Sequence, residues 1–457
     1  MPHFLDLNYD VLHLIITLLS QNDIFGLALS CRKGFDLALP QILYRIKFPP
    51  LDIAFAIHLC GFCSFVLADV VRRAPLVRIL ELDLRMYSYF LCLNDLQVGE
   101  YAFPMAIMKI LEHASNLQEL TFNPPEYLIQ DHPSLLSAAV ALPRLDSLTV
   151  SSSAPGPTIV SAVISRPRKL VLNFFQRSSR HTWNTLVSNL LQSGIAAYVE
   201  NLHLIKDDYL SAMPSLQFPR LHHITVSDAR IPIGSSFYLA GVFPNLHSLY
   251  WEKIKPRSSD KGTISITTRS ELDHVQFASC DILPLVGPVR RLTLTKLYER
   301  YEIENNIVTA LERAAPVVLH LDITRIKFDL AHLSAVAPSI RFLRLQVHST
   351  WKYRLPPSLR KMPLVAVSIF FEVKCRKKYV SDAGSILAEL VARNIPSVEY
   401  VEVNLCAYRL SPHYDHQRDR TEWHRVTSRE ADKCTVEKLP QWESDKVEDR
   451  LLAMTRV

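Results

Sequence analysis

Glycine and cysteine are scarce in this chain, and each scarcity excludes a group of functions. The 457 residues include 11 glycines, and no two of them are spaced as G-x-G, so the sequence has neither a dinucleotide-binding fingerprint nor a phosphate-binding loop. Eight cysteines fit no disulfide framework, and no Asn-x-Ser/Thr glycosylation site occurs. We therefore expect a protein of the cytoplasm, the nucleus or both, and not a nucleotide enzyme of these classes.

The chain also lacks a block of charge of one sign and a long unbroken apolar run. Its net charge of +6 comes from 51 basic and 45 acidic residues, without a Lys/Arg arm, so no nucleic-acid partner is expected. The most apolar stretch near the start, residues 11–31, is interrupted by Asn22 and Asp23 and preceded by Asp6 and Asp10. A secretory leader begins with positive charge and a membrane span needs about 18 unbroken apolar residues. We expect neither, and no membrane partner.

Residues 11–31 have instead the pattern of helices that are apolar on two sides. Polar residues recur every three to four positions and mark one narrow stripe on the first helix: Asp10, His13, Thr17, and Ser20 or Gln21. Asn22 or Asp23 could cap a second helix over residues 24–29, and Ser30 could cap a third that runs towards Leu43. A unit of about 40 residues rarely buries enough surface to stand alone, so we expect it to share apolar area with a neighbouring domain or another chain.

Residues 7–46, LNYDVLHLIITLLSQNDIFGLALSCRKGFDLALPQILYRI, resemble an F-box, especially the variant common in fungal proteins. Asn8 stands where the family usually has proline, and Phe35 where tryptophan is commoner. The resemblance implies that these helices dock on a Skp-type adaptor and, through it, on a cullin-RING ubiquitin ligase. The residues that it assigns to this contact are Leu7, Leu12, Ile15, Leu18, Leu19, Asp23, Leu27, Cys31 and Phe35.

From about residue 70 a short strand pattern recurs, in which apolar residues occupy the first, fourth and sixth positions. The first apolar anchors Leu221, Leu246 and Leu272 are 25 and 26 residues apart, inside the roughly 20 to 29 residue period of leucine-rich repeats. Helix-like segments lie between the strands, at residues 110–115, 185–194, 307–315 and 385–394. Strands are expected at 116–122, 144–150, 220–226, 245–251, 289–295, 339–345 and 397–403, with weaker copies at 77–84, 169–172, 199–204, 272–277 and 318–323.

This pattern resembles degenerate leucine-rich repeats and predicts an α/β fold. Single strand–helix units cannot bury their own faces, so about a dozen are expected to stack into a curved solenoid, or horseshoe. The predicted organisation is an F-box-like adaptor-binding module at 1–46, the solenoid at 47–408, and a polar tail at 409–457 that could cap the last repeat. Two unrelated globular domains are an alternative, but they would not explain one motif recurring over more than 300 residues.

Alternation along the strands places a set of polar side chains on the concave face of the predicted sheet. In the middle of the array this set is basic and aromatic, which favours an acidic target protein or ligand there. The alternative is a solvated sheet surface that binds nothing. The candidate target-binding residues are His223, Tyr250, His274, Arg291, His320 and Arg344.

Two patterns suggest chemistry, and neither fits its context. Cys60-Gly61-Phe62-Cys63 has the spacing of a redox pair, but it lies inside one apolar helix expected over 54–71, so packing is the favoured role. The tail residues His413, His416, His424 and Cys434 match no zinc spacing and are expected in a solvated segment. No H-E-x-x-H or G-x-S-x-G motif occurs, so we expect no catalysis, no metal and no cofactor.

The sequence thus favours a non-catalytic subunit of an SCF-type ubiquitin ligase. In this reading the F-box binds a Skp-type adaptor, the solenoid holds an unknown target protein, and proximity to the conjugating enzyme promotes ubiquitin-dependent degradation. The alternative is a repeat scaffold unrelated to ubiquitin transfer, whose N-terminal helices only cap the solenoid.

Overall fold

A computed structural model describes residues 7–48, 54–83, 97–98, 101–123, 126–151, 155–173, 189–190, 193–205, 217–231, 236–256, 265–267, 272–278, 285–295, 303–324, 328–348, 355–373, 383–407, 421–430 and 433–455. The chain forms two compact units. Unit 1 comprises Met1–Ile205 and Phe218–Arg220, and unit 2 comprises Lys206–Gln217 and Leu221–Val457. The N-terminal helices therefore belong to unit 1, and the C-terminal tail belongs to unit 2.

Unit 1 begins with the three expected helices, α1 (Tyr9–Leu18), α2 (Gln21–Ser30) and α3 (Arg32–Tyr44). Their caps differ from the prediction. Ser20, and neither Asn22 nor Asp23, caps α2, because its Oγ accepts from the Asp23 N–H (3.3 Å) and donates to the Asp23 carboxylate (2.5 Å). Cys31, and not Ser30, caps α3, with Sγ accepting from the Gly34 N–H at 3.3 Å. The helix α2 therefore begins three residues earlier than expected, whereas α3 begins one residue later than a Ser30 cap would place it.

The sheet of unit 1 is parallel, with neighbours in the order β1 (Arg45–Lys47), β2 (Ile79–Asp83), β5 (Glu119–Asn123), β6 (Ser147–Ser151), β7 (Lys169–Asn173) and β8 (Asn201–Ile205). The register aligns one buried leucine from each of five strands: Leu80, Leu120, Leu148, Leu170 and Leu202. This row is the repeated apolar anchor of the sequence pattern, and its burial explains why the strands stack in register.

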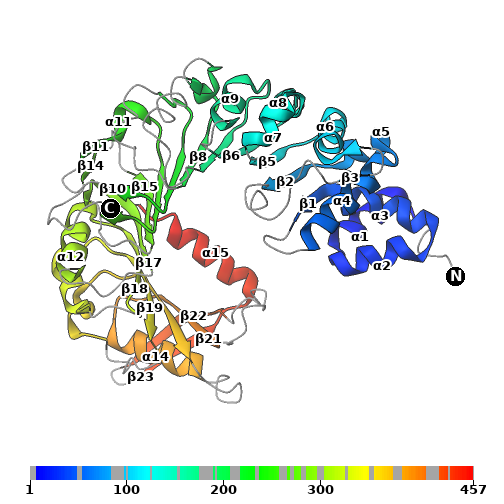
Figure 1. Cartoon of the computed structure of the whole chain (residues 1–457). Coiled ribbons are helices and arrows are strands. Elements are labelled where there is room, and N and C mark those ends of the chain that lie inside the picture. The colour runs from blue at the N-terminus through cyan, green and yellow to red at the C-terminus, as the bar shows by residue number, and fades with distance from the viewer. Residues whose placement is uncertain are drawn as a thin grey trace. The chain divides into compact units, whose positions relative to one another are not determined.

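Helices and short strands connect the strands of unit 1, and Figure 1 shows the helices along one side of the strands. The connecting elements are α4 (Ala54–Leu67), α5 (Val70–Arg73), η2 (Ala74–Leu76), β3 (Gln97–Val98), β4 (Tyr101–Ala102), α6 (Phe103–His113), α7 (Glu126–Asp131), α8 (Pro133–Val140), α9 (Pro155–Ala162) and η5 (Ile195–Ala197). Seven of the eleven residues of α6 are buried, from Phe103 to Leu111. The helices thus bury the faces that a single strand leaves open.

Unit 2 repeats the parallel arrangement and then changes direction. Its parallel strands are β9 (His223–Ser227), β12 (Ser248–Glu252), β15 (Leu272–Ala278), β17 (Val289–Thr295), β18 (Val318–Asp322), β19 (Phe342–His348), β20 (Ala366–Val373) and β21 (Tyr400–Ala407). The strands β22 (Thr421–Glu430) and β23 (Lys433–Lys438) then continue the sheet antiparallel. The aligned anchors of the parallel strands are again apolar and buried, from Ile224 to Val401.

The remaining elements of unit 2 lie between these strands. They are β10 (Arg230–Ile231) paired with β13 (Lys255–Pro256), and β11 (Ser236–Tyr238), β14 (Ser265–Thr267) and β16 (Leu285–Val286) in a second small parallel sheet. The helices are α11 (Leu239–Val242), α12 (Ile303–Ala314), η7 (Leu330–His332), α13 (Leu333–Val336), η8 (Pro357–Lys361) and α14 (Ala383–Asn394).

All twelve strands expected from the repeat pattern are present, several of them shifted by two or three residues towards the C-terminus. The helices expected at 110–115, 307–315 and 385–394 are confirmed as parts of α6, α12 and α14, whereas most of 185–194 lies outside the described residues. The pattern missed β20. Ala366, Val367, Ser368 and Ile369 are all buried, so this strand has no alternation of polar and apolar residues to detect.

The tail at 409–457, for which the sequence suggested a cap on the last repeat, forms regular secondary structure in its described part. Residues 421–438 form the β22–β23 hairpin, and α15 (Gln441–Leu452) then turns back across the face of the unit 2 sheet (Figure 1). We call this surface the α15 face. One apolar cluster joins the helix, the hairpin and the sheet: Val318, Phe342, Ala366, Tyr400, Trp423, Leu439, Val447 and Leu451. The tail therefore completes the core of unit 2.

Candidate partner-binding surfaces

The N-terminal helices expose more apolar side chains than a solvated helix normally does. Leu14 and Leu18 lie one turn apart on α1 and are 62% and 79% exposed, and Phe25 and Leu29 repeat the spacing on α2 at 44% and 87%. We call these four residues, together with Val11, the N-terminal apolar surface. Large exposed apolar side chains on consecutive helices are typical of a surface that another protein covers.

The residues that the F-box resemblance selected divide between this surface and the interior. Leu12 is 2% exposed and packs inside unit 1, so the prediction that it touches a partner is replaced by a role in the core. Leu7, Leu18, Asp23 and Cys31 are exposed, whereas Ile15, Leu19, Leu27 and Phe35 are half-buried. Leu19 and Leu27 pack on the core formed by Ile16, Ile24 and Ala38, and the ring of Phe35 meets Phe65 edge-on.

Sequence reasoning missed part of the N-terminal apolar surface, namely Val11, Leu14, Phe25 and Leu29. The available signal was the spacing of Val11, Leu14 and Leu18, which places three apolar residues on one stripe of α1. The whole helix is apolar outside its polar stripe, so periodicity alone could not separate the side that faces the core from the side that faces outward.

In unit 2, the six predicted target-binding residues lie on the α15 face in two adjacent rows. Register aligns Tyr250, His320 and Arg344 in one row, which also contains Thr225, Gln276, Thr293, Ser368 and Glu402. The other row reads His223, Ser248, His274, Arg291, Val318, Phe342, Ala366 and Tyr400. The second row is polar over β9–β17 and apolar over β18–β21, where α15 covers it.

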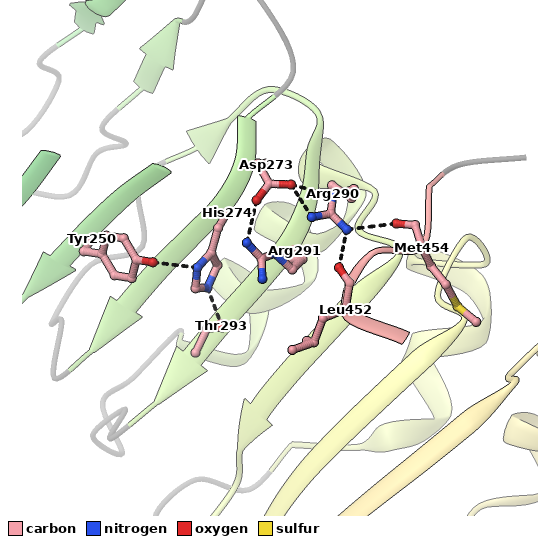
Figure 2. Close-up of polar contacts among 8 residues, drawn as sticks. All are labelled: Tyr250, Asp273, His274, Arg290, Arg291, Thr293, Leu452 and Met454. Atoms are coloured by element: carbon pink, nitrogen blue, oxygen red, sulfur yellow. Dashed lines mark hydrogen bonds and ion pairs between the residues drawn. The ribbon is translucent and has the colours of Figure 1, made fainter. Parts of the chain in front are cut away.

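The two arginines at the centre of the face are paired within the chain (Figure 2). Arg290 and Arg291 both bind the carboxylate of Asp273, and Arg290 Nε lies 2.5 Å from Asp273 Oδ1. Burial alone would raise the pKa of the Asp273 carboxyl, but hydrogen bonds and charge from the two arginines outweigh burial and lower it. Arg291 is therefore one part of an internal charge cluster and does not present a free cation.

His274 is held between two hydroxyl groups of neighbouring strands. Its Nδ1 lies 2.9 Å from Tyr250 Oη and its Nε2 lies 3.0 Å from Thr293 Oγ1, as Figure 2 shows. Burial, and then the positive charge of Arg291, lower the pKa of His274 to about 4. The ring is thus neutral at physiological pH, and its role is to fix the positions of Tyr250 and Thr293.

Arg344 connects the sheet to α15. Its Nη2 donates to Glu402 Oε2 at 3.2 Å and to Glu448 Oε1 of α15 at 2.7 Å. Burial raises the pKa of the Glu402 carboxyl, and the charge of Arg344 acts against that rise. Burial, and then the positive charge of Arg344, lower the pKa of His320 to about 4. The His320 ring stacks on Phe370.

The C-terminal end of α15 is held to the sheet by Arg290. Arg290 donates through Nη1 to the carbonyl oxygens of Leu452 and Met454, the latter at 3.2 Å (Figure 2). A cation at a helix C-terminus stabilises the free carbonyls and the helix dipole. The two arginines that favoured an acidic target are thus engaged within the chain: Arg291 binds Asp273, Arg344 binds acids of the sheet and of α15, and α15 occupies the adjoining apolar area.

A hollow remains open beside the covered area. It has a volume of about 430 Å³ and lies over β9–β19, and we call it the β9–β19 hollow. Its lining consists of Thr225, Tyr250, Trp251, Glu252, Gln276, Ala278, Thr295, Asp322 and Gln346. Among the described residues, the lining contains two carboxylates and no lysine or arginine. A smaller hollow of about 190 Å³ in unit 1 has mixed charge, with Arg45, Lys169, Glu81 and Glu119 in its lining.

The described residues offer little for redox or metal chemistry. Cys60 and Cys63 lie inside α4, and burial raises the pKa of both thiols, so the reactive thiolate form is disfavoured. His424 and Cys434 are buried in the hairpin, contrary to the expectation of a solvated segment, while His413 and His416 lie outside the described residues. No group of three or more His, Cys, Asp or Glu in the described segments could hold a metal ion. Nor does any helix in those segments have the length and apolar character to cross a membrane.

Comparison with known proteins identified no relative of this chain. No protein-family model matches the sequence, and no curated protein is significantly similar to it.

Proposed function

We propose that this protein is a non-catalytic, substrate-recruiting F-box-type subunit of a cullin-RING ubiquitin ligase, acting in the cytoplasm or the nucleus. The observation that carries the proposal is the N-terminal apolar surface, in which Leu14, Leu18 and Leu29 are each more than 60% exposed on the segment that resembles an F-box. Covering these side chains with a Skp-type adaptor would remove apolar area from water at about 25 cal/mol per Å².

In this proposal the strand–helix units form a leucine-rich-repeat-like solenoid, and the solenoid holds the target. In each unit the parallel strands align their buried anchors and leave one face for polar side chains, which is the arrangement such repeats use for binding. A target held on that face and an adaptor held on α1 and α2 would be joined through one chain, so target lysines would be concentrated near the conjugating enzyme.

The alternative is a repeat scaffold whose N-terminal helices serve only as the cap of unit 1. Two observations favour it: Leu12 and Ile16 pack inside the unit, and β1 directly follows α3 and pairs with β2. Deleting residues 1–46 would not discriminate the two functions, because the deletion also removes most of β1 and uncovers the edge of β2. Point substitutions in the exposed side chains of α1 avoid this problem.

The test is binding of the full chain to a purified Skp-type adaptor, measured by calorimetry. The variant Leu14→Lys/Leu18→Lys replaces two exposed leucines with cations, which suit the C-terminal half of α1. If both leucines are central contacts, the variant should bind at least about 100-fold more weakly than the wild-type chain.

The matched control is Ile164→Lys/Ile386→Lys, which makes the same chemical change at two exposed isoleucines elsewhere in the chain. It should bind the adaptor as the wild type does. Wild-type protein that is folded and fails to bind the adaptor, or equal loss in both variants, would favour the scaffold.

A further inference from the structure

We propose that the β9–β19 hollow receives a cationic side chain, arginine or lysine, of a target protein segment. The inference rests on the part of the proposed function that assigns target capture to the sheet, and it reverses the charge that the sequence alone suggested for the target. It does not depend on whether the adaptor binds at α1 and α2.

The first argument is the balance of charge on the α15 face. Each of its arginines is already engaged by an acid of this chain: Arg290 and Arg291 share Asp273, and Arg344 is bound by Glu402 and Glu448. The described lining of the hollow beside them contains Glu252 and Asp322 and no basic residue. Within the described lining of the hollow, a visitor therefore meets carboxylates and no cation.

The second argument is the chemistry of the lining. Glutamine side-chain oxygens, threonine hydroxyls and carboxylates all accept hydrogen bonds, and arginine and lysine are donors only. Asp322 is 4% exposed, and the N–H and hydroxyl of Thr324 hold its Oδ1 at 3.0 and 2.6 Å. Tyr250, fixed by its bond to His274, adds an aromatic ring to the lining. Rings of this kind attract cations when the geometry allows.

One cation already lies near the rim. Lys253 Nζ is 3.7 Å from Glu252 Oε1, with side chains 60% and 46% exposed. An exposed pair of neighbouring residues contributes little free energy, because water screens it and both side chains lose freedom. An incoming guanidinium or ammonium group can therefore replace Lys253 at Glu252 at small cost.

The experiment measures which peptides the purified full-length chain retains. Peptide pools are degenerate at every position except the centre, which is fixed as Arg, Lys, Asp, Glu or Leu. The wild-type chain should retain Arg- and Lys-centred pools about tenfold better than Asp- and Glu-centred pools, since charge-assisted hydrogen bonds in a hollow are worth at least that factor. Because the whole chain carries a net charge of +6, non-specific attraction would favour acidic peptides.

Two charge reversals test the location of the preference. Glu252→Arg places a cation in the hollow and should reduce the preference for basic pools to about twofold or less. The control Glu312→Arg makes the same charge change at an exposed residue of α12 and should keep the wild-type preference. Because an arginine at 252 could perturb folding, Glu252→Gln serves as a conservative second variant and should lower the preference in the same direction.

The inference is overturned if wild-type protein prefers acidic pools or shows no preference, or if Glu252→Arg retains the basic preference. None of these outcomes changes the adaptor measurement with the Leu14→Lys/Leu18→Lys variant, so a failure at the hollow can be told apart from a failure of the proposed ligase role.

Discussion

Gly34 illustrates how one residue sets the packing of the N-terminal helices. An added Cβ at Gly34 would lie 2.5 Å from the backbone oxygen of Leu27 and 3.0 Å from Ser30 Oγ, so α2 and α3 approach too closely there for any side chain. We expect Gly34→Ala to destabilise the protein by about 1–3 kcal/mol, the usual cost of overpacking. Urea unfolding followed by circular dichroism measures this loss.

Gly26 provides the matched comparison, because it lies within α2 and an added Cβ there would meet nothing within 4 Å. Gly26→Ala should stabilise the protein by about 0.5–1 kcal/mol through the better helix propensity of alanine. Equal effects of the two substitutions would contradict the close approach at Gly34.

The half-buried histidines of the α15 face predict how stability depends on pH. The folded-state pKa values of His274 and His320 are about 4, below the ordinary value of 6.5. Below pH 6.5 the unfolded chain therefore takes up protons that the folded chain does not, and stability falls as the pH drops from 6.5 towards 4. At pH 5.5 the expected loss is about 1 kcal/mol for each histidine, relative to pH 7.5.

The double variant His274→Gln/His320→Gln removes both titrating groups, and its unfolding free energy should depend less steeply on pH over this range. The comparison uses urea midpoints of wild type and variant at pH 7.5 and 5.5. A variant with the same pH slope as the wild type would show that these two rings do not carry the effect.

At the scale of single residues, the sequence predicted which side chains share a face but not how they are paired. The period-two alternation correctly placed Arg291 and Arg344 on the sheet face that carries Tyr250. Their partners Asp273 and Glu448 are 18 and 104 residues away, and no local pattern reveals contacts at such separations. Leu12 shows the same limit, because a helix that is apolar on two sides does not reveal which side is covered.

The helix α15 is the element that departs most from its sequence pattern. Half of the residues in QWESDKVEDRLL are charged, a composition typical of a solvated segment. Only Ser444, Val447 and Leu451 of the helix are buried, and Val447 and Leu451 suffice because Val318, Phe342 and Tyr400 supply the apolar surface on the sheet. The same apolar patch explains why β20 is buried on both faces and escaped the repeat pattern.

Leu451→Ala tests whether α15 is part of the core. Leu451 is fully buried in the cluster with Phe342 and Trp423, so its truncation should cost about 2–5 kcal/mol. Trp442→Ala on the same helix is the control. Trp442 is 63% exposed and its ring contacts only the Lys446 ammonium among the interactions described for it, so the cost should stay below about 1 kcal/mol. Urea unfolding measures the loss of stability in both variants. Equal losses would mean that Leu451 is not part of the core.

At the scale of the whole chain, the repeat period predicted an α/β structure, and each compact unit has one, with mostly parallel strands. The period could not predict the elements that do not repeat. These are the hairpin and helix at the end of unit 2, and β1, which follows α3 and is not part of a repeat. A period detects what recurs, whereas these elements occur once and depend on contacts with distant strands.

The central claim is that α1 and α2 present a surface for a Skp-type adaptor. Hydrogen–deuterium exchange of the full chain, with and without the purified adaptor, tests it most directly. The account predicts slower exchange at backbone amides of Tyr9–Leu18 and Gln21–Ser30 in the complex, with the strands of the α15 face unchanged. Unchanged exchange in both helices at saturating adaptor, or protection confined to the α15 face, would contradict it.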